Sequence, residues 1–140
     1  MGCRTSATAP AGKALALGPL SEEEKRDFFA GIDLFALPSR SDSFGLVLPE
    51  AWANAAPCVG YRAGGLPWVI RDGGDGLLVR CGDLEGLAEA LARLTTDRTL
   101  RQQLGEAGRQ RMGEFDWEVK LRLVRDECER LVAEGRRERR

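Results

Sequence analysis

The 140-residue chain contains no histidine, the side chain that most often serves as a general base and as a metal ligand. Catalysis of the serine–histidine–aspartate or cysteine–histidine type is therefore excluded within this sequence. Its four cysteines, Cys3, Cys58, Cys81 and Cys128, form no C-x2-C pair, so the sequence predicts free thiols rather than a zinc or redox site. We expect neither a metal site nor a cofactor.

The sequence also has little net charge and no long apolar run. The 21 lysines and arginines nearly balance the 22 aspartates and glutamates, and the formal net charge is -1. We therefore expect no general attraction to nucleic acids or to anionic membranes. No stretch approaches the roughly 20 apolar residues that a transmembrane helix needs, and residues 1–13 lack the apolar centre of a signal peptide. We expect a cytoplasmic protein.

Short apolar runs alternate with helix-like segments between residues 14 and 79. The runs at 14–17, 32–37, 57–61 and 77–79 are predicted strands, and 22–30, 46–55 and 68–71 are predicted helices. Ser21 and Glu24 form a capping box at the start of the first helix. This alternation predicts a parallel α/β sheet with helices on both faces. Because a complete doubly wound domain usually has six strands, we expect a partial Rossmann-like sheet.

After residue 82 the pattern is wholly helical, with Asp83, Asp97 and Asp116 placed to cap three helices. The first of them would bury one face of Leu84, Leu87, Ala88, Leu91 and Leu94. In the last, five residues recur at spacings of four, three, four and three; we call them the C-terminal stripe: Trp117, Leu121, Val124, Cys128 and Leu131. Such a stripe needs an apolar partner, so we expect self-association or tight binding to a missing half of the protein.

Two carboxylates, Asp42 and Glu50, stand eight residues apart across a turn-rich loop and a helix start. The amides of Gly45, Leu46 and Val47 would open this helix, whose positive end can bind a diphosphate. Glu50 can accept hydrogen bonds from ribose hydroxyls, and Asp42 can meet a sugar. From the residues alone, the alternative is a strand, a turn and a helix that carry two solvated acids.

The region around these acids resembles the donor-binding half of GT4-type retaining glycosyltransferases, which have the GT-B fold. The similar segments occur in the family's order at residues 37–39, 42–53, 57–59, 64–65 and 75–79. At their centre lies the family's E-x7-E motif, with Asp42 in the first acidic position and Glu50 in the second. The resemblance covers about residues 14–134 and implies the C-terminal half of a GT-B fold.

The resemblance implies metal-independent retaining transfer from a nucleoside-diphosphate sugar, with Asp42 and Glu50 as the catalytic residues. Glu50 would bind the ribose, Asp42 would touch the transferred sugar, and the amides of Phe44, Gly45 and Leu46 would face the sugar and phosphates. Arg40 and Arg62 flank the two loops and are candidates for phosphate contact. The full expected donor site is Arg40, Ser43, Phe44, Gly45, Leu46, Val47, Glu50, Arg62, Gly64 and Gly65.

Three features depart from the family pattern. Asp42 is one methylene shorter than the usual glutamate. Trp68 stands three residues after the double glycine, where glutamate is common, and it either caps the core or narrows the sugar pocket. The arginine and lysine pair that neutralises the diphosphate, and the N-terminal acceptor domain, have no counterpart in this sequence.

The expected organisation is a flexible lead-in at 1–12, an N-terminally incomplete nucleotide-sugar-binding domain at 13–115, a C-terminal helix at 116–134 and a polar tail at 135–140. The expected function is a glycosyltransferase donor-binding domain that needs an acceptor domain and is inactive alone. A non-catalytic nucleotide-binding or interaction module is the alternative, and a GT-B epimerase or phosphorylase shares the architecture.

Overall fold

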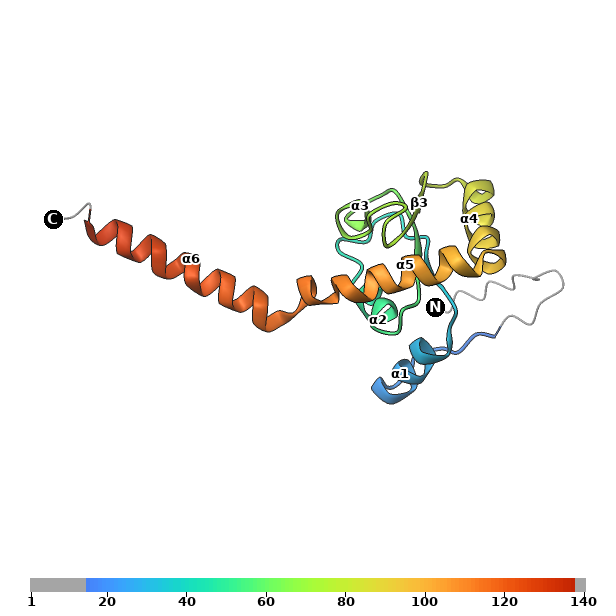
Figure 1. The fold of residues 1–140 in the computed structure, drawn as a ribbon, viewed down its shortest axis with the longest axis horizontal. Coiled ribbons are helices and arrows are strands. Elements are labelled where there is room, and N and C mark those ends of the chain that lie inside the picture. Colours follow the sequence, from blue (N-terminus) through green and yellow to red (C-terminus); the bar gives the residue numbers. More distant parts are fainter. Residues whose placement is uncertain (1–14, 138–140) are drawn as a thin grey trace, which may run out of the picture.

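The computed structural model describes residues 15–137, with side chains described as far as Gly135. Figure 1 shows a body of strands and helices from which the last helix extends away. The elements in chain order are α1 (Glu22–Gly31), β1 (Phe35–Leu37), α2 (Val47–Ala53), β2 (Cys58–Tyr61), α3 (Leu66–Val69), β3 (Gly76–Val79), α4 (Leu84–Thr96), α5 (Arg98–Arg111), the 3-10 helix η1 (Met112–Phe115) and α6 (Trp117–Arg137).

The three strands form a parallel sheet in the order β1-β2-β3, in which Cys58 of β2 lies between Phe35 and Gly76. All four residues of β2 are buried, and successive residues point to opposite faces. Cys58 packs on one face with residues of α1, α2 and α3, whereas Val59 packs on the other with Leu94 of α4 and residues of α5. The predicted parallel α/β class is therefore confirmed.

The local signals that start helices act as the sequence predicts. Ser21 and Glu24 make both hydrogen bonds of the capping box before α1. Asp83 accepts a hydrogen bond from the Gly86 amide, and Asp97 accepts one from the Leu100 amide. Each cap satisfies a backbone donor that has no partner inside its helix, which fixes the first turn.

Several expected boundaries are wrong. The run 14–17 is not a strand where it is described, because residues 15–17 pair with no strand and are exposed; Ala14 lies outside the described residues. The strand predicted at 32–37 shrinks to β1, whose only strand neighbour among residues 15–137 is β2, and Ala36 is exposed. β1 therefore makes strand hydrogen bonds along one edge only, and no second neighbouring strand extends its pairing.

The helix boundaries also move. α2 ends at Ala53 rather than at residue 55, where Ala55 has a positive φ of 55°. α3 begins at Leu66 and ends at Val69, before the expected end at residue 71. Leu84 and Ala88 face solvent, and the buried side of α4 is supplied by Leu87, Ala90, Leu91 and Leu94. α6 continues to Arg137, through part of the expected polar tail.

A buried ion pair fastens the end of α5 to the turn before β3. Arg111 Nη1 lies 2.7 Å from Asp75 Oδ2, and the two side chains are only 10% and 3% exposed. The same guanidinium donates to the Val69 carbonyl oxygen, and the Trp52 indole nitrogen donates to the Asp75 carbonyl oxygen. Because Trp52 belongs to α2, this cluster also fixes the helix that carries Glu50.

Cys58, Cys81 and Cys128 are free thiols, as predicted, and Cys3 lies outside the described residues. Burial raises the pKa of the Cys58 thiol far above its usual range. None of the helices between residues 15 and 137 combines the length and the apolar character that a bilayer crossing requires.

Candidate functional site

The candidate site lies where the parallel strands end. The loop 38–46 follows the carboxyl end of β1, and the loop 62–65 follows that of β2. In parallel α/β sheets this edge is the usual place for a ligand. The two loops that the sequence singled out therefore lie at the same edge of the sheet.

Asp42 organises the first of these loops with its own side chain. Its Oδ1 atom accepts hydrogen bonds from the Phe44 amide, at 2.9 Å, and from the Gly45 amide. Two of the three amides expected to face a donor are therefore occupied by the carboxylate. In this conformation Asp42 fixes the loop, a role that the sequence analysis did not foresee.

The double glycine allows the second loop to rest directly on the first. The Gly65 amide donates to the Asp42 carbonyl oxygen at 2.7 Å. A Cβ atom at Gly64 would lie 2.3 Å from that oxygen, and one at Gly65 would lie 1.8 Å from the Ser43 carbonyl oxygen. Only glycine permits this approach. Gly64 and Gly65 therefore lie against the loop of Asp42 and Ser43, and the structure brings these four predicted site residues together.

Glu50, on α2, faces α1 rather than the double glycine. Its Oε1 atom lies 2.9 Å from Lys25 Nζ, and its Oε2 atom is buried without a hydrogen-bond partner among the described residues. Hydrogen bonds to Glu50 and then to Glu22 raise the pKa of the Lys25 ammonium. An unpaired buried carboxylate oxygen is costly unless a ligand or water satisfies it.

A hollow of ≈ 490 Å³ lies between α1 and α2 and includes Glu50 in its lining. Lys25, Arg26 and Asn54 contribute further polar side chains to it. Lys25 and Asn54 were not among the expected site residues. Lys25 is 25 positions from Glu50 in the chain, and the packing of α1 on α2 brings the two side chains together. Their spacing along the sequence therefore could not predict this ion pair.

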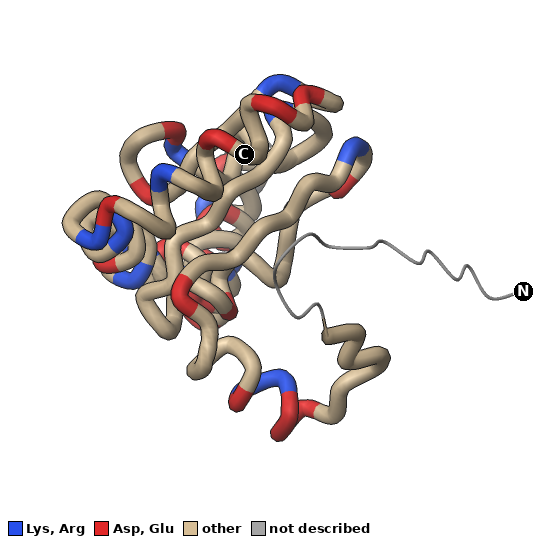
Figure 2. The backbone as a smooth tube through the Cα atoms, turned by 90° about the vertical axis from the view of Figure 1, so that its right-hand side faces the viewer, with Lys and Arg blue, Asp and Glu red and all other residues tan. Residues whose placement is uncertain are grey.

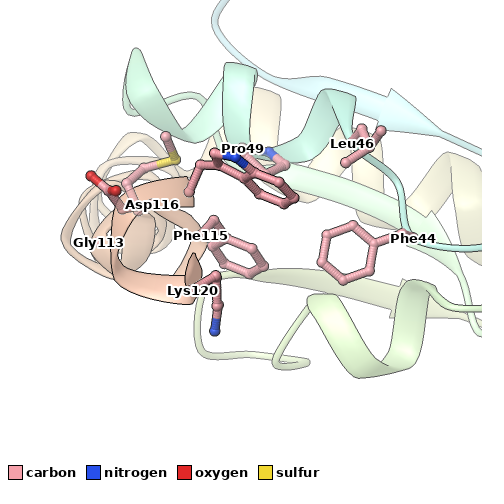
Figure 3. Close-up of a pocket in the computed structure, with 9 residues that line it drawn as sticks. Phe44, Leu46, Pro49, Gly113, Phe115, Asp116 and Lys120 are labelled. Atoms are coloured by element: carbon pink, nitrogen blue, oxygen red, sulfur yellow. The ribbon is translucent and has the colours of Figure 1, made fainter. Parts of the chain in front are cut away.

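Phe44 and Leu46 point to a second, apolar hollow of ≈ 470 Å³ beside η1 and the start of α6 (Figure 3). The Phe44 ring packs edge-on against Phe115, with 6.0 Å between ring centroids. Leu46 is exposed, and Val47, one residue on, packs partly buried against the core. The side chains of this loop thus face η1, whereas Glu50 faces α1.

Neither of the two candidate phosphate-binding arginines lines the hollow at Glu50. Arg62 pairs with Asp72, Nη2 to Oδ2 at 2.5 Å, and Arg40 extends toward the turn at Gly82. Trp68 is 86% exposed, so the first of its two alternatives, that it caps the core, is wrong. Figure 2 shows acidic and basic residues interspersed along the described chain. Within residues 15–137, no group of three or more cysteine, aspartate or glutamate side chains could hold a metal ion.

The fold and the position of these loops define a parallel α/β domain with its candidate site beyond the carboxyl ends of the strands. The sequence profile described as glycosyl transferases group 1 matches residues 4–111, and the chain belongs to this family. The family resemblance inferred from the sequence is therefore confirmed.

Individual relatives agree with this assignment. The lipopolysaccharide core biosynthesis glycosyltransferase LpsE of Rhizobium meliloti is 38% identical over 99 residues, which are 70% of this chain and 29% of LpsE. The structure of sucrose-phosphate synthase from Thermosynechococcus elongatus matches with a TM-score of 0.75 and 30% identity, over 84% of this chain and 30% of that one. The chain thus spans less than a third of each of these relatives.

A second solved structure matches in fold. HepE of Anabaena, in complex with UDP, has a TM-score of 0.68 and 23% identity over 73% of this chain and 29% of that one; the same protein is also solved with UDP-glucose. Together with the sucrose-phosphate synthase match, this similarity confirms the expected C-terminal half of a GT-B fold.

Proposed function

We propose that this chain is the donor-binding part of a retaining glycosyltransferase and that Glu50 accepts hydrogen bonds from the ribose hydroxyls of a nucleoside diphosphate. The observation that carries the proposal is the Glu50 carboxylate, whose Oε1 atom is held by Lys25 while its Oε2 atom is buried and unpaired. A ribose hydroxyl is a donor that would satisfy Oε2. The Glu50 side chain as a whole is 37% exposed, and it lines the hollow between α1 and α2.

Family membership supports the class of ligand. HepE, which shares this fold, is solved with UDP and with UDP-glucose. A nucleoside-diphosphate sugar is accordingly the proposed donor, and no other cofactor is part of the proposal. We place the donor-binding unit at residues 13–115, which include nearly all of the family match.

Asp42 has a different proposed role. Because its Oδ1 atom holds the amides of Phe44 and Gly45, its other carboxylate oxygen is the one that would contact the transferred sugar. The loop of Ser43 and the double glycine would form the wall of the sugar site. Binding of the diphosphate by the Phe44 and Gly45 amides would require Asp42 to release them.

We expect Glu50→Gln to weaken binding of a nucleoside diphosphate more than Asp42→Asn does. A hydrogen bond to a charged acceptor contributes on the order of 1.5–3 kcal/mol, and the sugar contact of Asp42 is absent when the ligand carries no sugar. Titration calorimetry with uridine, guanosine and adenosine diphosphates measures both variants.

Two controls separate ligand contact from loss of the ion pair. Lys25→Met removes the partner of Glu50 but keeps the carboxylate, and Glu106→Gln removes an exposed acid that pairs with Arg109. Glu106→Gln should bind like the wild type. Equal affinities for wild type and Glu50→Gln would remove Glu50 from the proposed site.

The second prediction is that this 140-residue chain alone turns over no donor. Retaining transfer needs an acceptor hydroxyl presented against the bound donor, and such positioning contributes roughly 7–11 kcal/mol in favourable cases. In the proposal, an N-terminal acceptor domain, which the family resemblance implies, holds the acceptor. That acceptor is a sugar or another hydroxyl compound. Release of nucleoside diphosphate, with and without simple sugars, is the assay.

Acceptor-dependent release that Glu50→Ala abolishes would contradict this prediction and make the chain a complete enzyme. A non-catalytic nucleotide-binding or interaction module is the second candidate function. It is favoured by Arg62, which is paired with Asp72 rather than free for a phosphate. Nucleotide binding that yields no transfer, even when an acceptor domain from a relative is supplied, would support that candidate.

A further inference from the structure

The carboxylate of Asp42 occupies two amides that the proposed donor needs. Its Oδ1 atom accepts hydrogen bonds from the Phe44 amide, at 2.9 Å, and from the Gly45 amide. These contacts span two and three residues, a pattern that aspartate adopts readily in turns and that the longer glutamate side chain does not share. Hydrogen bonds to an ionised acceptor are stronger than those to a neutral one. The free protein therefore places its own anion on these amides.

Other contacts hold the backbone of this loop without the Asp42 side chain. The Gly65 amide donates to the Asp42 carbonyl oxygen at 2.7 Å, and the Leu48 amide donates to the Gly45 carbonyl oxygen at 2.8 Å. Gly45 is buried with a φ of 62°, and a Cβ atom there would lie 2.8 Å from Leu48 Cδ1. The Asp42 side chain can therefore turn away while the two amides stay in place.

We propose, on the basis of the proposed function, that Asp42 competes with the diphosphate of the ligand for the amides of Phe44 and Gly45. A diphosphate that binds there displaces the carboxylate, which loses two hydrogen bonds. A sugar on the diphosphate offers hydroxyl donors to the displaced carboxylate, whereas a sugar-free diphosphate offers none. Asp42 is thereby a specificity-determining residue, which favours the intact donor over the sugar-free diphosphate that remains after transfer.

The charge of Asp42 strengthens this discrimination. A displaced carboxylate that stays beside a diphosphate repels it, because both carry negative charge. Arg62, the arginine of the second loop, pairs with Asp72 rather than with Asp42. Hydroxyl groups of a donor sugar supply hydrogen bonds that offset the loss of the two amides. A sugar-free diphosphate therefore meets the full cost of displacing Asp42.

Three substitutions at Asp42 separate its hydrogen bonds from its charge. Asp42→Ala removes both, whereas Asp42→Glu keeps the charge on a side chain that does not favour the two amide contacts. We expect both variants to bind a sugar-free nucleoside diphosphate several-fold more tightly than the wild type does. Asp42→Asn keeps a neutral oxygen acceptor for the amides, so its affinity should lie between those of the wild type and Asp42→Ala.

Titration calorimetry of the full chain measures these affinities with UDP, GDP and ADP, each beside its glucose conjugate. For the nucleotide that binds most tightly, the ratio of the two dissociation constants should shift several-fold toward the sugar-free diphosphate in Asp42→Ala. The matched control is Asp97→Ala, because Asp97 also accepts an amide hydrogen bond, from Leu100 at 2.9 Å, but lies outside both loops. It should bind both ligands like the wild type.

Amide hydrogen exchange, followed by nuclear magnetic resonance without nucleotide, tests the release of the amides directly. The Phe44 and Gly45 amides should exchange several-fold faster in Asp42→Ala and Asp42→Glu than in the wild type. The Leu48 amide should keep its wild-type rate, because its partner is the Gly45 carbonyl oxygen. This pattern would show that the substitutions free the two amides and leave the backbone of the loop in place.

Several results would overturn the proposal. If the wild type binds a diphosphate and Asp42→Ala binds it no more tightly, the competition is refuted while the donor site stands. Tighter binding by Asp42→Ala but not by Asp42→Glu would mean that charge alone acts. Unchanged exchange at Phe44 and Gly45, or faster exchange at Leu48, would refute the release of the amides from an intact loop. If no diphosphate binds to any variant, the proposed function itself fails and this inference fails with it.

Discussion

Arg111→Ala is expected to lower the free energy of unfolding by about 3–5 kcal/mol, the usual cost of removing one partner of a buried ion pair. The substitution leaves the Asp75 carboxylate buried without its cation, because that side chain is only 3% exposed. It also removes the donor to the Val69 carbonyl oxygen and the guanidinium that lies over the Trp52 and Phe115 rings. Urea unfolding followed by circular dichroism measures the change.

Arg109→Ala is the matched control, because this arginine lies two positions earlier on α5 and pairs with Glu106 at the exposed surface. Exposed pairs contribute little to stability, so Arg109→Ala should unfold close to the wild type. A loss below about 1 kcal/mol in Arg111→Ala would contradict the view that the ion pair fastens α5 to the sheet. In that case the cluster would not fix α2 and Glu50 either.

Gly65→Ala is expected to separate the two loops of the candidate site. The added Cβ would lie 1.8 Å from the Ser43 carbonyl oxygen, whereas real Cβ atoms essentially never approach a heavy atom within 3.0 Å. The backbone must therefore move by about 1.2 Å, the difference between those distances. Overpacking typically costs about 1–3 kcal/mol, and the donor-binding loop should lose its shape as well.

Thermal unfolding and nucleotide titration of this variant measure the two effects. The control is Gly31→Ala at the end of α1, where a Cβ would meet nothing within 4 Å. It should leave stability and binding close to those of the wild type. An unchanged melting temperature and unchanged affinity in Gly65→Ala would show that the contact between the loops is not needed.

The parts of the fold that follow from neighbouring residues could be predicted from the sequence. The capping box of Ser21 and Glu24 and the caps at Asp83 and Asp97 act over three residues, so the sequence contains both partners side by side. The apolar run at β2 is buried on both faces, and it is too short for a helix, so its length predicts a strand. The order of strands and helices then follows from their alternation.

Features that depend on distant partners could not be predicted in the same way. The run 15–17 is apolar, but no described strand lies beside it. The pair of Arg111 and Asp75 joins residues 36 positions apart, and only the folded chain brings them together. The Asp42 contacts are different, because they span only two and three residues. An aspartate in a turn commonly accepts such amides, so this contact could have been predicted, but the place of Asp42 in the acidic motif pointed to the sugar instead.

The central claim is that Glu50 binds the ribose of a nucleoside diphosphate. A thermodynamic cycle that combines two protein variants with two ligands tests it most directly. Wild type and Glu50→Gln are titrated with the diphosphate that binds most tightly and with its 2′,3′-dideoxy analogue. We predict that the substitution weakens the ribose ligand by about 1.5–3 kcal/mol and leaves the dideoxy ligand unchanged. Equal losses with both ligands, or no loss with either, would contradict the account.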